Sequence, residues 1–158
     1  MTDLPVYTAA DVAAQPTIDL SSFDNDDAVD LGLIAVEVIR EQNVSLAVRI
    51  LLRGDVVFQA KLKATGPGND PWLAGKAAVV EHFGDPSLLV KLRHQEAGTP
   101  FEDRDDVDHA VLKAHGGSMP IRVNGEVVGS ITTSGEPDVV DHRATAEAVR
   151  RYLGRVAA

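Results

Sequence analysis

The stretch AHGGSMPIRVNGEVVGSITTSGEPDVVDH, residues 114–142, decides the fold because it predicts a β-hairpin that leads into a helix. Apolar residues flank Arg122 in alternation, and the pair Asn124-Gly125 follows as a two-residue turn of the kind that closes antiparallel hairpins. The segment EVVGSITTS then forms the returning strand. Residues 109–115, HAVLKAH, are a candidate for a further strand beside this hairpin.

A second hairpin is expected upstream. In LAVRILLR, residues 46–53, every second side chain is apolar, and the same alternation returns in VVFQAKLKA, residues 56–64. Gly54-Asp55 stands between the two runs, and Gly54 can adopt the left-handed conformation that a tight turn needs. The sequence therefore predicts two antiparallel strands closed at Gly54-Asp55.

Helices are expected on either side of these hairpins. Residues 26–42 have apolar side chains at helical spacing and also on other faces, so this helix is expected to pack on a sheet and on another subunit. Asp70 and Pro71 read as the N-cap and first residue of a helix that extends to residue 83. A shorter helix is expected over 88–95, and an amphipathic helix at the C-terminus.

This order of elements predicts an α+β fold, an antiparallel sheet with flanking helices. Residues 1–24 read as an N-terminal arm with little regular structure, in which VYTAADVAAQ could form a short helix. No interdomain linker interrupts the remainder, so residues 25–158 are expected to form a single domain.

The composition bears on partners and location. The chain of 158 residues has a formal charge of −9, and its only concentration of basic residues is Arg150, Arg151 and Arg155. Nucleic-acid binding needs clustered Lys and Arg, so no nucleic-acid partner is expected. The longest apolar run, residues 31–39, is too short to span a bilayer, so no membrane partner is expected either. The N-terminus lacks a secretory pattern, which predicts a cytoplasmic location.

The helix after residue 70 offers a candidate ligand site. Its preceding loop is not a nucleotide phosphate loop, because Asp70 stands where a glycine is required and neither Ser nor Thr follows Lys76. Trp72 and Lys76 lie one turn apart on one face. Together with free backbone N–H groups at the helix start, they could hold the carboxylate of a small or flat ligand. The alternative is a capped helix with a solvated Lys76.

Two histidines stand near unusual backbone. His115 precedes Gly116-Gly117, and paired glycines in a strand-forming sequence indicate a bulge or a close backbone approach. His142 lies in the first turn of the last helix, where the alternative is a partly exposed residue near a cap. The sequence places no further ligands for a zinc site, contains no cysteine, and lacks the Gly-x-Ser-x-Gly turn of a hydrolase nucleophile.

The pair Lys76-Ala77 in a helix after a glycine-containing loop, together with GGSMPIRVNGEVVGSITTSGEPDVVDH, resembles the GlcG/HbpS-like family, also called the haem-degrading-domain family. The resemblance covers residues 27–153. It implies a profilin- or PAS-like sandwich that assembles into homo-oligomers of two or more subunits.

The resemblance also implies a ligand, which in some relatives is haem or another tetrapyrrole. His142 or His115 would then be the haem-iron ligand, and Lys76 would be the anion partner. The ligand-binding residues expected on this basis are Asn69, Asp70, Trp72, Lys76, His115, Gly116, Gly117, Ser118 and His142.

Three functions follow as hypotheses. The first is an oligomeric protein that binds haem or another small anionic ligand. The second is a non-catalytic oligomeric scaffold or protein-partner module, motivated by the apolar first helix. The third is an enzyme acting on a small acid metabolite, for which the sequence shows no catalytic constellation.

Overall fold

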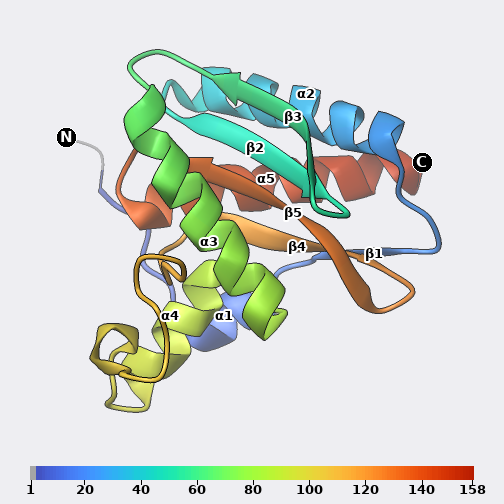
Figure 1. The fold of residues 1–158 in the computed structure, drawn as a ribbon. Helices are drawn as coiled ribbons and strands as arrows, with labels where there is room; N and C mark the ends of the chain where they lie inside the picture. Colours follow the sequence, from blue (N-terminus) through green and yellow to red (C-terminus); the bar gives the residue numbers. More distant parts are fainter. Residues whose placement is uncertain (1–2) are drawn as a thin grey trace.

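The computed structural model describes residues 3–158, in which a five-stranded sheet lies between two layers of helices (Figure 1). The strands are β1 (Ile18–Leu20), β2 (Ala47–Leu52), β3 (Asp55–Lys61), β4 (Ser118–Val123) and β5 (Glu126–Ser134). Their order across the sheet is β1-β4-β5-β2-β3. The pairs β4–β5, β5–β2 and β2–β3 are antiparallel, whereas β1 runs parallel to β4. The α+β class predicted from the sequence is confirmed.

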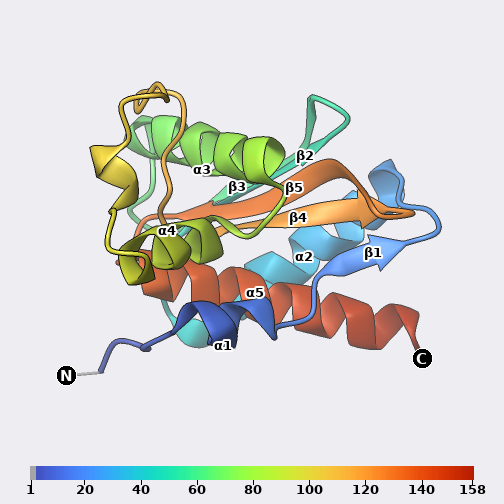
Figure 2. The ribbon, with the colours of Figure 1, turned by 90° about the horizontal axis from the view of Figure 1, so that it is seen from below.

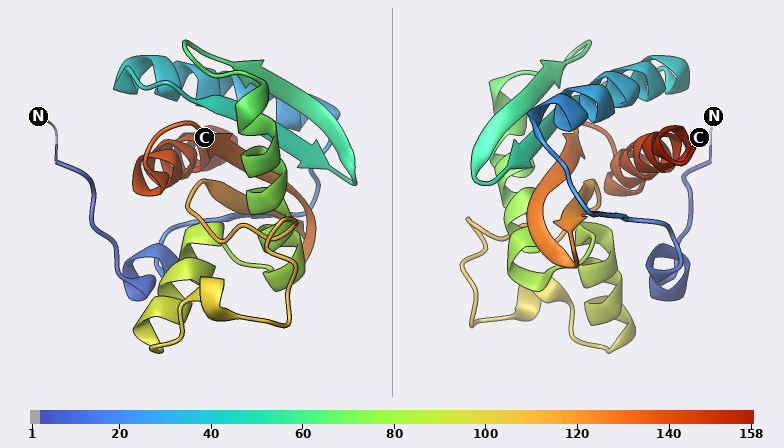
Figure 3. Two further views of the ribbon diagram at one scale, coloured as in Figure 1. Left: turned by 60° about the vertical axis from the view of Figure 1, so that its left-hand side comes forward. Right: turned by 90° about the vertical axis from the view of Figure 1, so that its right-hand side faces the viewer.

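Each face of the sheet carries helices. The helices are α1 (Ala9–Ala13), α2 (Asn25–Gln42), α3 (Asp70–Phe83), α4 (Ser87–Glu96) and α5 (Asp138–Val156), with short 3-10 turns at Pro67–Asn69 and Phe101–Asp103. Two long helices, α2 and α5, cover one face, and α3 lies across the other with α4 beside it (Figures 2 and 3). Within residues 3–158, no helix is long and apolar enough to cross a membrane, and the cytoplasmic location stays a prediction.

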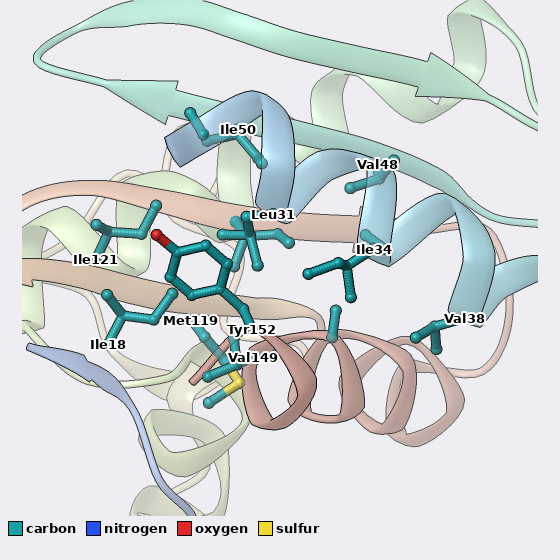
Figure 4. Packing of buried hydrophobic residues seen from close by; sticks show 14 of the residues in the cluster. Ile18, Leu31, Ile34, Val38, Val48, Ile50, Met119, Ile121, Val149 and Tyr152 are labelled. Carbon is teal, nitrogen blue, oxygen red and sulfur yellow. The ribbon is translucent and has the colours of Figure 1, made fainter. Parts of the chain in front are cut away.

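The main core lies between the sheet and the pair α2–α5. Helical spacing brings Leu31, Ile34 and Val38 of α2 to this interface, where they meet Val149 and Tyr152 of α5 (Figure 4). The strands contribute a further buried set: Ile18, Val48, Ile50, Met119, Ile121 and Ile131. Because the core is aliphatic, it is held by shape and apolar burial with few aromatic contacts.

Both predicted hairpins are present, with one shift. At the β4–β5 turn, Asn124 and Gly125 have φ values of 49° and 83°, which confirms the left-handed two-residue turn. The β2–β3 turn is formed by Arg53 and Gly54, with φ values of 51° and 83°, and Asp55 already belongs to β3. The prediction of Gly54-Asp55 was therefore wrong by one residue, because Arg53 accepts the left-handed conformation that is usual for glycine.

The start of α3 also differs from the prediction. The helix begins at Asp70 itself, and Asn69 is the residue before it. The Asp70 carboxylate lies 2.8 Å from Lys61 Nζ and 3.6 Å from Arg49 Nη2, on the neighbouring strands. Asp70 therefore joins α3 to the β2–β3 hairpin rather than capping the helix.

Residues 109–115 are not a strand. Leu112 and Ala114 leave the sheet and pack with Val79, Val90 and Phe101 in a second apolar cluster beneath the connection after α4. Conversely, the N-terminal arm is more regular than predicted. It contains the expected short helix α1 and also β1, which extends the sheet at the β4 edge.

Candidate functional site

A cleft opens where the start of α3, the start of α5 and residue 115 meet. Its cavity measures about 390 Å³ and is lined by Gly68, Asn69, Trp72, Lys76, His115, Ser134, Gly135, Glu136, Asp138 and Asp141. The side-chain amide of Asn69 donates to the Ser134 carbonyl at 3.3 Å and so joins the start of α3 to the end of β5. The start of a helix has backbone N–H groups without a partner inside the helix, and the start of α5 borders this cleft; at α3 the Asp70 N–H donates to the Pro67 carbonyl and Pro71 has no N–H.

A buried ion pair forms the floor of the cleft. Lys76 Nζ lies 2.7 Å from Asp141 Oδ2 and donates to the Thr133 carbonyl at 3.0 Å. Lys76 is 2% exposed and Asp141 is 1% exposed, so the predicted alternative of a solvated Lys76 is wrong. Burial lowers the pKa of Lys76 and raises the pKa of Asp141 to about 6, while their mutual attraction opposes both shifts. An ammonium carries three hydrogens, which leaves one for a ligand.

Gly116 and Gly117 allow the chain to pass directly behind this ion pair. A Cβ at Gly116 would stand 2.4 Å from the Asp138 carbonyl oxygen, and one at Gly117 would stand 2.4 Å from that of Thr133 and 3.0 Å from Lys76 Nζ. Gly117 also has a φ of 136°, which disfavours other residues. The close backbone approach expected from this glycine pair is therefore confirmed.

Trp72 and His115 form the outer wall. Trp72 is 41% exposed, its ring centroid lies 5.4 Å from that of His115, and Lys113 Nζ lies 4.9 Å from the indole. His115 is half-buried, with Nδ1 3.8 Å from Asp138 Oδ2. Burial, aided by the charge of Lys91, lowers the pKa of His115. At neutral pH this imidazole is therefore uncharged and can accept a proton or ligate a metal.

The sequence analysis missed three carboxylates of the cleft, Glu136, Asp138 and Asp141. Each has its own donor: Glu136 accepts from the Ser45 amide at 2.8 Å, Asp138 from Lys91 at 2.7 Å, and Asp141 from Lys76 and the Glu136 amide. Asp138 and Asp141 lie three residues apart in the first turn of α5, a spacing that places them on one face. That spacing was the available signal.

His142 does not reach the cleft. It is fully buried, its Nε2 lies 2.6 Å from Gln15 Oε1, and its ring meets the edge of Tyr7 at 5.2 Å between centroids. Burial lowers the pKa of His142 to about 4. The alternative of a partly exposed residue is wrong, because the N-terminal arm covers this part of α5 (Figure 2).

The predicted site residues thus divide into two sets, and Asp70, Ser118 and His142 belong to the set outside the cleft. The structure brings Asn69, Trp72, Lys76 and His115 together in the cleft, with Gly116 and Gly117 behind them. Ser118 is buried elsewhere, where its backbone N–H donates to Ser87 Oγ and its hydroxyl accepts from Thr132. Within residues 3–158, no group of three or more His, Cys, Asp or Glu side chains could hold a metal ion.

A family model and individual relatives of known sequence both match most of this chain. The sequence model of the family described as "Haem degrading protein HbpS-like" matches residues 23–150. A UPF0303 protein of Streptomyces coelicolor is 44% identical over 133 residues, covering 84% of each chain. A UPF0303 protein of Paraburkholderia xenovorans is 33% identical over 133 residues, covering 84% of this chain and 81% of its own.

Solved structures share the fold. The crystal structure of the Ybr137w protein superposes with a TM-score of 0.80 at 23% identity, covering 89% of this chain and 83% of that one. A complex of PduOC with haem gives 0.68 at 17% identity, covering 82% and 94%. The crystal structure of HbpS gives 0.65 at 20% identity, covering 89% and 94%. At these identities the likeness concerns the fold alone.

Proposed function

Because the chain belongs to the HbpS-like family, we propose that its cleft binds a small molecule that combines a flat ring with a carboxylate. The observation that carries this proposal is the pairing, within one cavity, of an exposed indole and a neutral imidazole with a buried ammonium. Family membership and the haem complex of PduOC, a protein of the same fold, support ligand binding as the function.

The inner end of the cleft suits the carboxylate. Of the three acidic side chains there, Asp141 and Asp138 are neutralised by Lys76 and Lys91, and Glu136 is held by the Ser45 N–H and keeps its charge. What is left for a ligand is donor capacity: the third N–H of Lys76 and the backbone N–H groups of the first residues of α5. A carboxylate oxygen accepts from such donors.

The outer end suits the ring. Trp72 offers an exposed aromatic surface, and aromatic pairs gain from stacked or edge contacts. The remaining wall is polar, which suits a ligand held at one edge with its ring over Trp72. It does not suit a ring enclosed on both sides.

Haem is the first ligand to test, since its macrocycle is flat and its propionates are carboxylates. His115 would be the iron ligand in this chain, because it lines the cleft in the neutral form and His142 does not. Bound iron would supply a redox-active, ligand-exchanging centre at the mouth of the cleft. The residues of the cleft would bind and orient the macrocycle: Trp72 beneath the ring, and Lys76 at a propionate.

Titration of haem into the purified protein is expected to give a sharpened Soret band that saturates at one haem per cleft. His115→Ala should shift the band by removing the residue that would bind the iron, and Trp72→Ala should weaken binding by about tenfold. His82→Ala is the matched control, because His82 lies exposed on α3 outside the cleft.

A parallel titration with iron-free protoporphyrin tests the ring and carboxylates without iron. Saturation by both compounds supports the general proposal, and saturation by haem with a band unmoved in His115→Ala would assign the iron ligand to another residue. Failure of both compounds, and of a panel of aromatic carboxylates in calorimetry, would leave the scaffold and enzyme hypotheses in its place.

We also propose that the chain forms a homo-oligomer through the outer side of α2. Leu33 is 58% exposed and Val29 37% exposed on this helix, and Val56 at the neighbouring edge strand β3 is 47% exposed. Light scattering at micromolar concentration is expected to give a particle of at least twice the chain mass of 16.8 kDa. Leu33→Glu should reduce that mass, and a monomeric wild type would contradict the proposal.

A further inference from the structure

A second pocket is lined by residues of the N-terminal arm, the end of α2 and α5. The ribbon shows these three segments on one side of the molecule (Figure 2). We call this second pocket the arginine pocket. Its cavity measures about 400 Å³, it shares no residue with the cleft, and its polar lining includes Tyr7, Gln15, Gln42, Arg143, Arg150 and Arg151.

Arg143 is the unusual residue of this pocket. Across residues 3–158, its guanidinium makes neither a hydrogen bond nor an ion pair, and its Nε is buried without any partner. A buried donor that lacks an acceptor destabilises the fold, because it has lost its hydrogen bond to water and has not gained one within the protein. Because this Nε is closed to solvent, a bound anion would meet the two terminal nitrogens, which arginine presents as a planar fork that matches two oxygens of one anion. The guanidinium of Arg143, which has no partner within residues 3–158, therefore favours the binding of an oxyanion.

The charges around Arg143 point the same way. Three arginines line the pocket against Glu147, and Glu41 pairs with Arg151, which leaves one positive charge in excess in a chain of net charge −9. Arg150 and Arg151 both bind Glu147, at 2.7 and 2.8 Å, and Arg151 also binds Glu41. These ion pairs fix the two guanidinium groups beside Arg143 but do not neutralise all three. A local positive field of this kind concentrates anions.

Neutral groups complete the donor set. The Tyr7 hydroxyl stays protonated, because burial raises the pKa of Tyr7. Gln15 engages His142 through its oxygen, which leaves its NH₂ group available. The Gln42 side-chain oxygen is buried without a partner, and an amide can present its NH₂ group in the same place by a half-turn. Donors from α2, α5 and the arm thus surround one cavity.

We propose that the arginine pocket binds a phosphate group, with the guanidinium of Arg143 donating to two of its oxygens. The guanidinium of Arg143, which has no ion-pair partner, attracts an anion, and donors from three elements match a tetrahedral group better than a planar one. The phosphate is either free inorganic phosphate or the end of a small phosphate monoester. Because Tyr7 and Gln15 belong to the arm, occupancy would also fasten the arm onto α5.

The test is calorimetry at low ionic strength in a phosphate-free buffer at pH 7.5, with inorganic phosphate and glycerol 3-phosphate as separate titrants. Saturable binding of at least one titrant at one site per chain is expected. Arg143→Ala should weaken it by about tenfold or more, and Arg143→Lys should restore it only in part, because lysine keeps the charge and loses the fork. Thermal melts followed by circular dichroism establish that both variants are folded.

Two controls make the result specific. Arg155→Ala removes the same charge from the exposed end of the same helix, outside the pocket, and Trp72→Ala alters only the cleft. Both should leave phosphate affinity unchanged. Tighter binding of glycerol 3-phosphate than of phosphate would identify a monoester as the ligand, whereas equal affinity would identify the phosphate group alone.

Several results would overturn the proposal. These are the absence of saturation with both titrants, unchanged affinity in Arg143→Ala, or an equal loss in Arg155→Ala, which would reveal only diffuse attraction. If phosphate does not bind and Arg143→Ala instead dissociates an oligomer in light scattering, the partner of Arg143 is a carboxylate of a second copy and not a phosphate.

Discussion

Lys76→Met is expected to lower the free energy of unfolding by about 3–5 kcal/mol, because it leaves the Asp141 carboxylate buried without its counter-ion. The loss should shrink in acid, since a protonated Asp141 no longer carries the unpaired charge. Lys76→Met combined with Asp141→Asn should cost less than the two single changes added together. Urea unfolding at pH 7.5 and pH 5 measures all of these quantities.

The control for this experiment is Arg93→Met. Arg93 lies 2.7 Å from Asp85, the same distance as in the buried pair, but its side chain is 53% exposed. Its removal should change stability by less than about 1 kcal/mol. Equal losses for Lys76→Met and Arg93→Met would show that burial does not determine the strength of the pair at the floor of the cleft. Because Lys76→Met is expected to destabilise the fold, Lys76 variants are poorly suited to binding assays. Substitutions at Trp72 and His115 are better suited to them.

His142 should make stability depend on pH. Its pKa in the folded protein is about 4, against 6.5 as the ordinary value, because the buried imidazole resists charge. Between those pH values the unfolded chain binds the proton and the folded chain does not, so the contribution of His142 is complete above pH 6.5 and is lost as the pH falls to 4. The loss amounts to about 3 kcal/mol.

The comparison that isolates this effect is with His142→Gln, which cannot titrate. Asp141 works in the opposite direction, since its raised pKa of about 6 favours the folded state as the pH falls, but that contribution is common to both proteins. The stability advantage of wild type over His142→Gln should therefore shrink by about 3 kcal/mol from pH 7 to pH 4. Parallel stability curves for the two proteins over this range would show that His142 takes up its proton in the folded state as easily as in the unfolded one.

Local chemistry in the sequence was sufficient for much of the fold. Asn124-Gly125 predicts its turn because a left-handed pair can close a hairpin whatever lies around it. The periodicity of α2 predicts its buried face because residues three and four apart share one side of a helix. Gly116-Gly117 predicts a close approach because both residues lack a side chain. Each signal lies within a few residues of its structural effect.

Where the local sequence signal was weak, tertiary contacts decided the structure. β1 has only three residues, too few for alternation to be read, and it exists because β4 offers it an edge. Residues 109–115 alternate like a strand, but Phe101 and Val90 supply a separate apolar cluster that draws Leu112 and Ala114 away from the sheet. In both cases the partner that decides the structure lies outside the segment: β4 for β1, and Val90 and Phe101 for residues 109–115.

The sequence by itself determined which residue types were available to the site: a tryptophan, a lysine, histidines and a glycine pair. Only the tertiary structure decided their roles. It buried Lys76 against Asp141 across 65 positions of sequence, left His115 at the cleft, and closed the arm over His142. The physical reason is that a turn or a helix depends on neighbours in the chain, whereas desolvation and charge pairing depend on what folding brings into contact.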